Sequence, residues 1–195
     1  MSLELLSKEV VSFVEESWNA SKDYLDLSEE LHDQVNEGLK GVKEADNLKQ
    51  NHQDIAKESL NQKKSQLRDK LQRIKETDLS SIQSNYEPVT ADLVAEVTLL
   101  SQLDLQSSDI EKYKEKYKNN PLLLKKLRSI SEEKKAFVAF EDTKEETLEK
   151  LVKELENALE YFESPDFTSY GAKINIIANG TIDKINRNVK NYKNY

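Results

Sequence analysis

The chain has no cysteine and, among its 195 residues, only three prolines and four glycines. Without cysteine it can form no disulfide, thiolate nucleophile or cysteine-ligated zinc site. The first 87 residues contain no proline and just two glycines, Gly38 and Gly41. Because proline and glycine are the strongest breakers of regular structure, their scarcity predicts long, nearly uninterrupted helices in this region.

Long hydrophobic runs are also missing from the sequence. No apolar stretch approaches the roughly 20 residues that a transmembrane helix needs. The helix expected at residues 3–25 has an acidic polar face, where anionic membranes favour lysine and arginine, so we expect no contact with a membrane. The N-terminus shows no basic region followed by an apolar run, and we therefore expect no signal peptide. Together with the lack of cysteine, these features predict a cytoplasmic protein.

Charge is abundant, and the apolar residues that remain are regularly spaced. Charged residues make up 34% of the chain and hydrophobic residues 36%, whereas ordinary globular domains are about 25% charged. Polar, charged chains can be disordered, but here the apolar residues recur every three or four positions. We therefore predict an all-α fold built from long, solvated helices with narrow apolar edges.

Residues 1–79 are predicted to form a long, coiled-coil-like helical arm, either as one continuous helix or as a hairpin. A first amphipathic stretch covers residues 3–25, and a possible break follows at residues 26–28. A second stretch covers residues 28–75. Its apolar edge contains Leu31, Val35, Leu39, Val42, Ala45, Leu48, His52, Ile55, Leu60, Leu67, Leu71 and Ile74.

An arm of this length cannot bury its apolar edge against itself. At about 1.5 Å per residue the second stretch alone would be on the order of 70 Å long. The edge needs a neighbouring helix or another chain. We therefore predict that Phe13, Trp18, Leu31 and Val35 contact a protein partner.

The rest of the chain is predicted to form a connector at residues 80–89, a small helical bundle at residues 90–190 and a frayed tail at residues 191–195. Four helix starts carry capping signals: Thr90, the box Ser108–Glu111, Asn120 followed by Pro121, and the box Thr143–Glu146.

Three further helices are expected within the bundle. The helix expected at residues 91–103 is apolar nearly all round, which predicts a place in the centre of a core. The helix before residues 164–166 is expected to end there, and a last helix is expected at residues 169–190.

No catalytic, cofactor or metal site is predicted. Glu29 and His32 have the Glu-x-x-His spacing of dimetal bundles, but such a site needs a second copy, and His52 is preceded at that spacing by Lys49. His52 lies on the apolar edge, as a packing residue or as a pH-sensitive contact in a dimer. The chain has no Gly-x-Ser-x-Gly elbow and no glycine-rich phosphate loop, so we predict that it is not an enzyme.

Charges are grouped in blocks of alternating sign. Residues 80–111 carry six acids and no base, residues 112–135 carry nine bases and three acids, and residues 167–195 carry five bases and one acid. Lys184, Arg187 and Lys190 of the last block could bind an acidic protein surface or nucleic acid phosphates. The formal net charge of −8 favours the protein surface.

One segment carries a family resemblance. Tyr117-x-x-Asn120-Pro121-Leu122, followed by Leu124 and Leu127, resembles a helix–turn–helix segment of small helical proteins from phages and prophages of low-GC Gram-positive bacteria. A long N-terminal helix with a basic C-terminal helix is also similar in outline to phage scaffolding proteins.

The resemblance implies a scaffold-like, head-associated or connector protein that binds copies of itself or a coat-like protein. The alternative is a small intracellular adaptor, regulator or inhibitor that binds one host protein through the same arm.

Overall fold

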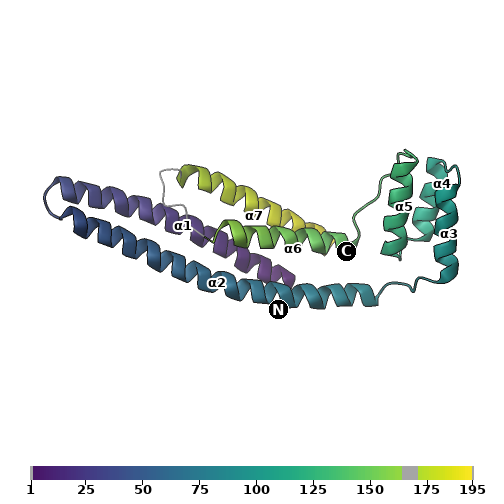
Figure 1. The fold of residues 1–195 in the computed structure, drawn as a ribbon, viewed down its shortest axis with the longest axis horizontal. Coiled ribbons are helices and arrows are strands. Elements are labelled where there is room, and N and C mark those ends of the chain that lie inside the picture. Colours follow the sequence, from purple (N-terminus) through teal and green to yellow (C-terminus); the bar gives the residue numbers. More distant parts are fainter. Residues whose placement is uncertain (1, 164–170, 195) are drawn as a thin grey trace. The chain divides into compact units, whose positions relative to one another are not determined.

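The computed structural model describes residues 2–163 and 171–194, and this part of the chain contains helices and no strand. The all-α prediction is therefore confirmed. The helices are α1 (Leu3–Asn36), α2 (Val42–Ser84), α3 (Ala91–Gln102), α4 (Ser107–Lys116), α5 (Pro121–Glu133), α6 (Lys144–Tyr161) and α7 (Gly171–Lys193) (Figure 1).

The chain divides into two compact units. Unit 1 comprises Met1–Thr77 with Thr147–Tyr195, and unit 2 comprises Asp78–Glu146. This differs from the expected division into residues 1–79 and residues 90–190, because α6 and α7 join the long helices instead of the short ones. Amphipathic helices pack wherever a complementary apolar surface lies, so order along the sequence does not decide their neighbours.

The N-terminal arm is a hairpin, and the predicted break at residues 26–28 is wrong. α1 runs through these residues to Asn36. Gly38 then adopts a left-handed conformation with φ of 73°, and the Leu39 N–H donates to the carbonyl of Gln34 at 2.9 Å. Glycine favours this conformation because it has no Cβ. Leu31 is buried beyond the expected break, which stabilises the continued helix.

Ion pairs define how the helices of unit 1 are arranged. Glu9 pairs with Lys70 at 2.7 Å and Glu16 pairs with Lys63, so α1 and α2 are antiparallel. α2 and α6 are also antiparallel, since Arg68 pairs with Glu160 at 3.0 Å and Lys75 with Glu156 at 3.6 Å. The Glu4–Lys193 pair at 2.8 Å joins the start of α1 to the end of α7. The order is that of an up-down-up-down bundle.

The apolar core of unit 1 draws on all four of its helices. Its fully buried large side chains include Leu6, Phe13, Leu67, Leu148, Leu151, Leu155, Leu159 and Ile185. Burying each such side chain contributes about 1.5–3 kcal/mol. α6 supplies four of the eight, so this short helix is a main contributor to the core of unit 1.

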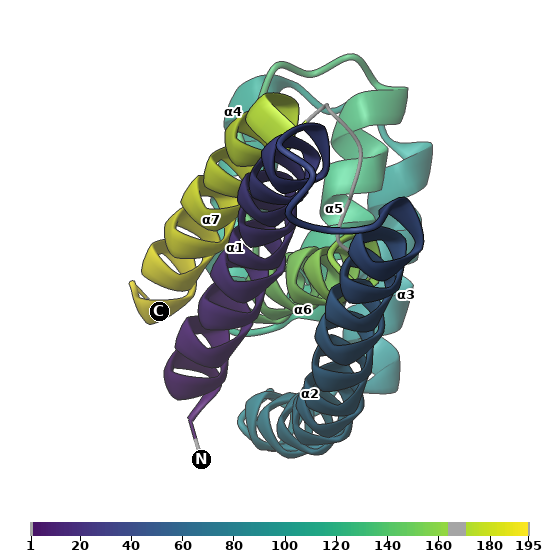
Figure 2. The ribbon, with the colours of Figure 1, turned by 90° about the vertical axis from the view of Figure 1, so that its left-hand side faces the viewer.

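α7 lies directly beside α1 (Figure 2). Ser7, Val14 and Ser21 recur every seven residues, on the side of α1 that carries Glu4, and all three are buried. The Ser7 hydroxyl donates to the Leu3 carbonyl at 2.8 Å, and the Ser21 hydroxyl to the Ser17 carbonyl at 3.2 Å. Small side chains with locally satisfied hydroxyls let the two backbones come close.

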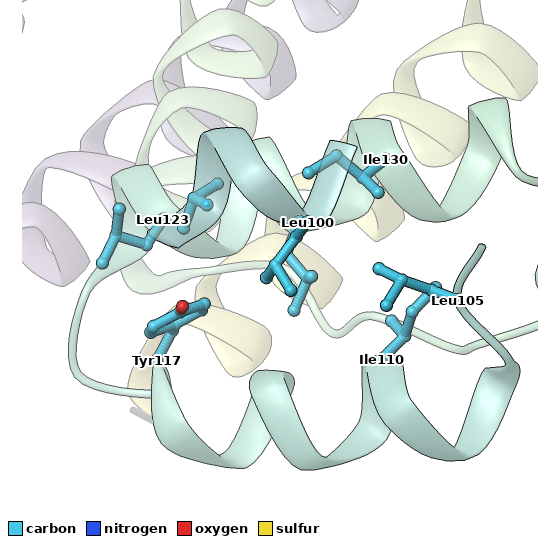
Figure 3. Close-up of a cluster of buried hydrophobic side chains, with 8 residues drawn as sticks. Leu100, Leu105, Ile110, Tyr117, Leu123 and Ile130 are labelled. Carbon is cyan, nitrogen blue, oxygen red and sulfur yellow. The ribbon is translucent and has the colours of Figure 1, made fainter. Parts of the chain in front are cut away.

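Unit 2 is built from α3, α4 and α5 around its own apolar cluster. Figure 3 shows Leu100, Leu105, Ile110, Tyr117, Leu123 and Ile130 converging between these helices. Partly buried side chains pack around them, including Leu93 from α3 and Val138 and Phe140 from the segment after α5. Unit 2 therefore has a core that is separate in sequence from that of unit 1.

Three of the four predicted helix starts are confirmed. Thr90 Oγ1 accepts from the Leu93 N–H at 3.3 Å, and Asn120 Oδ1 accepts from the Leu123 N–H at 3.2 Å. The box Thr143–Glu146 has both of its hydrogen bonds, at 2.7 and 3.2 Å.

The remaining start and the connector are shifted. α4 begins at Ser107, where the Gln106 N–H donates to the Asp109 carboxylate at 3.3 Å, so the predicted box Ser108–Glu111 is displaced by two residues. α2 also continues to Ser84, which shortens the connector expected at residues 80–89. The helix end expected at residues 164–166 falls outside the part of the chain that the structure describes.

Candidate interaction surfaces

The residues of the arm that were predicted to contact a partner differ in how far they are buried. Phe13 is 0% exposed and Leu31 is 2% exposed, so both belong to the interior of unit 1. This corrects the prediction for these two residues, because a side chain in a packed core cannot reach a partner in this fold. Trp18 and Val35 are half-buried. The correction has one cause: α2, α6 and α7 cover most of the apolar edge of α1.

The predicted basic residues are at the surface. Lys184, Arg187 and Lys190 are exposed on α7. Lys193, further along the same helix, is engaged by Glu4. Its hydrogen bond and charge lower the pKa of the Glu4 carboxyl from its ordinary value of 4.5. The basic face of α7 available to a partner therefore centres on Lys184, Arg187 and Lys190.

Four large apolar side chains are exposed along the turn between α1 and α2 and the first part of α2. Leu39 is 70% exposed, Val42 62%, Leu48 38% and Ile55 69%. Figure 1 shows this turn extending past the ends of α6 and α7. We call these four residues the hairpin-end surface. All four belong to the apolar edge predicted from the sequence. The spacing of apolar residues did not show that these four would lie at the end of the hairpin, beyond the cover of other helices.

Beneath this surface the two helices of the hairpin pack on each other. Leu31 of α1 and Ala45 of α2 are buried, and the rings of Tyr24 and His52 lie 6.4 Å apart. Nε2 of His52 is buried without a hydrogen-bond partner among the atoms of the described residues. His52 thus occupies the packing position that the apolar edge predicted.

α3 departs from the expectation that it lies in the centre of a core. Val97 and Leu100 are buried, but Val94 is 52% exposed, Leu99 58% and Leu103 51%. α3 is therefore covered on one face only. Its all-round apolar composition signals a second apolar face that the chain leaves open, which sequence reasoning missed.

A groove of about 400 Å³ lies between α1 and α2. Its lining includes Lys8, Lys63 and Lys70, each of which is paired with a carboxylate, from Glu4, Glu16 and Glu9 in turn. With its cations already neutralised, the groove has no excess charge with which to select an anionic cofactor.

The Glu-x-x-His motif lies on the surface. Glu29 and His32 are both exposed on α1. Over residues 2–163 and 171–194 no group of three or more metal-binding side chains comes together. Within the same residues no helix is long and apolar enough to cross a bilayer.

The fold and its surfaces define an all-α protein of two helical units with open apolar faces. Comparison with known proteins returned no matching family model, no matching curated protein and no matching solved structure.

Proposed function

We propose that this chain is a non-enzymatic structural or assembly protein that works by self-association or by docking a protein partner. The hairpin-end surface carries the proposal, since Leu39, Val42 and Ile55 are each more than 60% exposed at one end of a helical hairpin. Large exposed apolar side chains that the chain's own helices leave uncovered are candidates for protein–protein contact. The partner is a further copy of the chain or a coat-like protein.

The basic face of α7 supports the same role. Lys184, Arg187 and Lys190 are exposed, and long-range attraction to an acidic protein surface would orient the partner before the apolar residues engage. Each exposed ion pair contributes only about 0–1 kcal/mol, so the charges select the partner while the apolar residues supply affinity.

The phage-type assignment within this proposal rests on the resemblance of the segment from Tyr117 to Leu127. The structure gives that segment a capped turn between two helices, with Asn120 as the N-cap of α5 and Pro121 in its first turn. Such a turn occurs in many helical proteins, so its geometry does not favour one function. The resemblance of the sequence is what supports a scaffold-like or head-associated protein.

Sedimentation velocity over a range of concentrations tests the self-association. We expect the wild-type chain to form larger species as concentration rises, and the double variant Leu39→Lys with Ile55→Lys to remain monomeric. Leu122→Lys is the matched control, because Leu122 is also exposed, at 58%, but lies in unit 2. Equal association of the double variant and the wild type would reject the hairpin-end surface as the contact.

A second candidate is an intracellular adaptor, regulator or inhibitor of one host protein. It is favoured by the burial of Leu60, Leu67 and Leu71 within unit 1, which leaves less apolar surface of the arm for extended assembly. A wild-type chain that stays monomeric at every concentration and binds one host protein with fixed stoichiometry would support this candidate against the first.

A further inference from the structure

We propose that the open face of α3 binds a basic amphipathic helix of a partner protein. This site lies in unit 2 and does not depend on the hairpin-end surface or on the function proposed for it. Three features of α3 carry the inference: the shape of its open face, the charge around that face and its size.

In the first turns of α3 the open face has a low centre with higher sides, and Thr98 and Gln102 continue its midline toward the other end of the helix. Ala91 and Ala95 are exposed and lie near its midline, on the side of the helix opposite the buried Val97 and Leu100. Val94 stands on one side of this line, and Leu99 and Leu103 stand on the other. Small residues flanked by larger ones allow a second helix to seat its own side chains between them.

The chain segment that contains α3 carries acidic charges only, and Lys116 of α4 reaches the flank of the helix. Residues 80–111 contain six acids and no base. Asp92 and Asp104 are exposed near the two ends of α3. Glu96, on the flank, is already neutralised by Lys116 of α4. A partner helix with lysine or arginine at both ends and apolar residues between them would meet complementary groups along its whole length.

The same charges argue against a second copy of α3 as the occupant. In an antiparallel pair Asp92 of each copy would approach Asp104 of the other, and in a parallel pair each acid would approach its own counterpart. Like charges held opposite each other are destabilising. α3 has 12 residues and is about 18 Å long, so its open face fits one short partner helix in a weak contact and falls short of the roughly 800 Å² per partner of a stable dimer.

A labelled synthetic peptide provides the test. It is an amphipathic helix of about 16 residues, long enough to span α3, with alanine and leucine on one face and lysine at both ends. Binding to the full-length chain is followed by fluorescence anisotropy. We expect micromolar affinity for the wild type, weakened by about tenfold or more in Leu99→Lys and in Ala95→Lys.

Two controls make the result specific. Leu39→Lys adds the same charge to an exposed leucine of unit 1 and should bind the peptide as the wild type does. A peptide with glutamate in place of lysine should bind at least about tenfold more weakly, because its ends would face Asp92 and Asp104. Circular dichroism checks that each variant keeps its helices, which we expect because both substituted side chains are exposed.

Each opposite result overturns the proposal. Unchanged peptide binding in both Leu99→Lys and Ala95→Lys would place the peptide elsewhere, and equal binding of the glutamate peptide would remove the charge argument. Absence of wild-type binding up to about 1 mM peptide would show that the face does not take such a helix. A wild-type dimer that Leu99→Lys abolishes and Leu39→Lys preserves would identify a second copy as the occupant.

Discussion

Asn120 satisfies two separate parts of unit 2 with one side chain. Its Oδ1 accepts from the Leu123 N–H at 3.2 Å and so caps α5, while its Nδ2 donates to the Glu87 carbonyl at 3.0 Å. The residue is 3% exposed. The sequence showed the cap through the Asn-Pro pair, but the bond to Glu87 joins residues 33 positions apart and has no local signal.

We predict that Asn120→Ala lowers the free energy of unfolding of unit 2 by about 1–3 kcal/mol, because the cap is lost and a carbonyl loses its donor. Asn119→Ala is the matched control. Its side chain donates to the Glu87 carboxylate at 3.2 Å in an exposed setting, so the expected change is within about 0.5 kcal/mol. Urea unfolding followed by circular dichroism measures both, and equal losses would contradict the prediction.

Among elements, α1 lies beside α7, and small residues of α1 are buried on the side that carries Glu4. The sequence predicted a role in packing or binding for Phe13 but not for Ser7 and Ser21, which are also buried. A serine reads as a surface residue in a hydrophobic pattern. Only a neighbouring helix makes its small volume useful, and the sequence did not show that α7 would be this neighbour.

A larger side chain in this contact should separate the two helices. We predict that Ser21→Leu lowers the free energy of unfolding of unit 1 by about 1–3 kcal/mol through overpacking. Asn19→Leu, on the exposed side of the same helix, should change it by less than about 0.5 kcal/mol. Urea unfolding monitored by Trp18 fluorescence gives both values. An unchanged free energy of unfolding in Ser21→Leu would show that the site accommodates the larger side chain and would contradict the prediction.

For the whole molecule, the two units have separate cores. Leu155 of unit 1 and Leu127 of unit 2 are both 0% exposed. Trp18, the only tryptophan, lies in unit 1, so its fluorescence reports that unit selectively. Circular dichroism reports the helices of both.

We predict that Leu155→Ala lowers the free energy of unfolding of unit 1, and Leu127→Ala that of unit 2, by about 2–5 kcal/mol each. Leu155→Ala should lower the denaturant midpoint of Trp18 fluorescence, whereas Leu127→Ala should leave that midpoint in place and shift only part of the circular dichroism signal. If both substitutions move the Trp18 midpoint equally, the units unfold as one cooperative body.

The sequence by itself determined the local structure of this protein. The scarcity of proline and glycine, the three-to-four spacing of apolar residues and the caps at Thr90, Asn120 and Thr143 predicted the helices and several of their starts. These signals act between residues that are close along the chain, so they can be read without knowing the fold.

Only the tertiary structure decided which apolar surfaces are buried and which are open. It placed Phe13 and Leu31 in a core, left Leu39, Ile55 and Leu99 exposed, and grouped α6 and α7 with the N-terminal hairpin. An apolar stripe indicates that a helix packs against a neighbour, but it does not indicate which element that neighbour is. That choice depends on contacts between residues far apart in the sequence, where shape and total buried area decide.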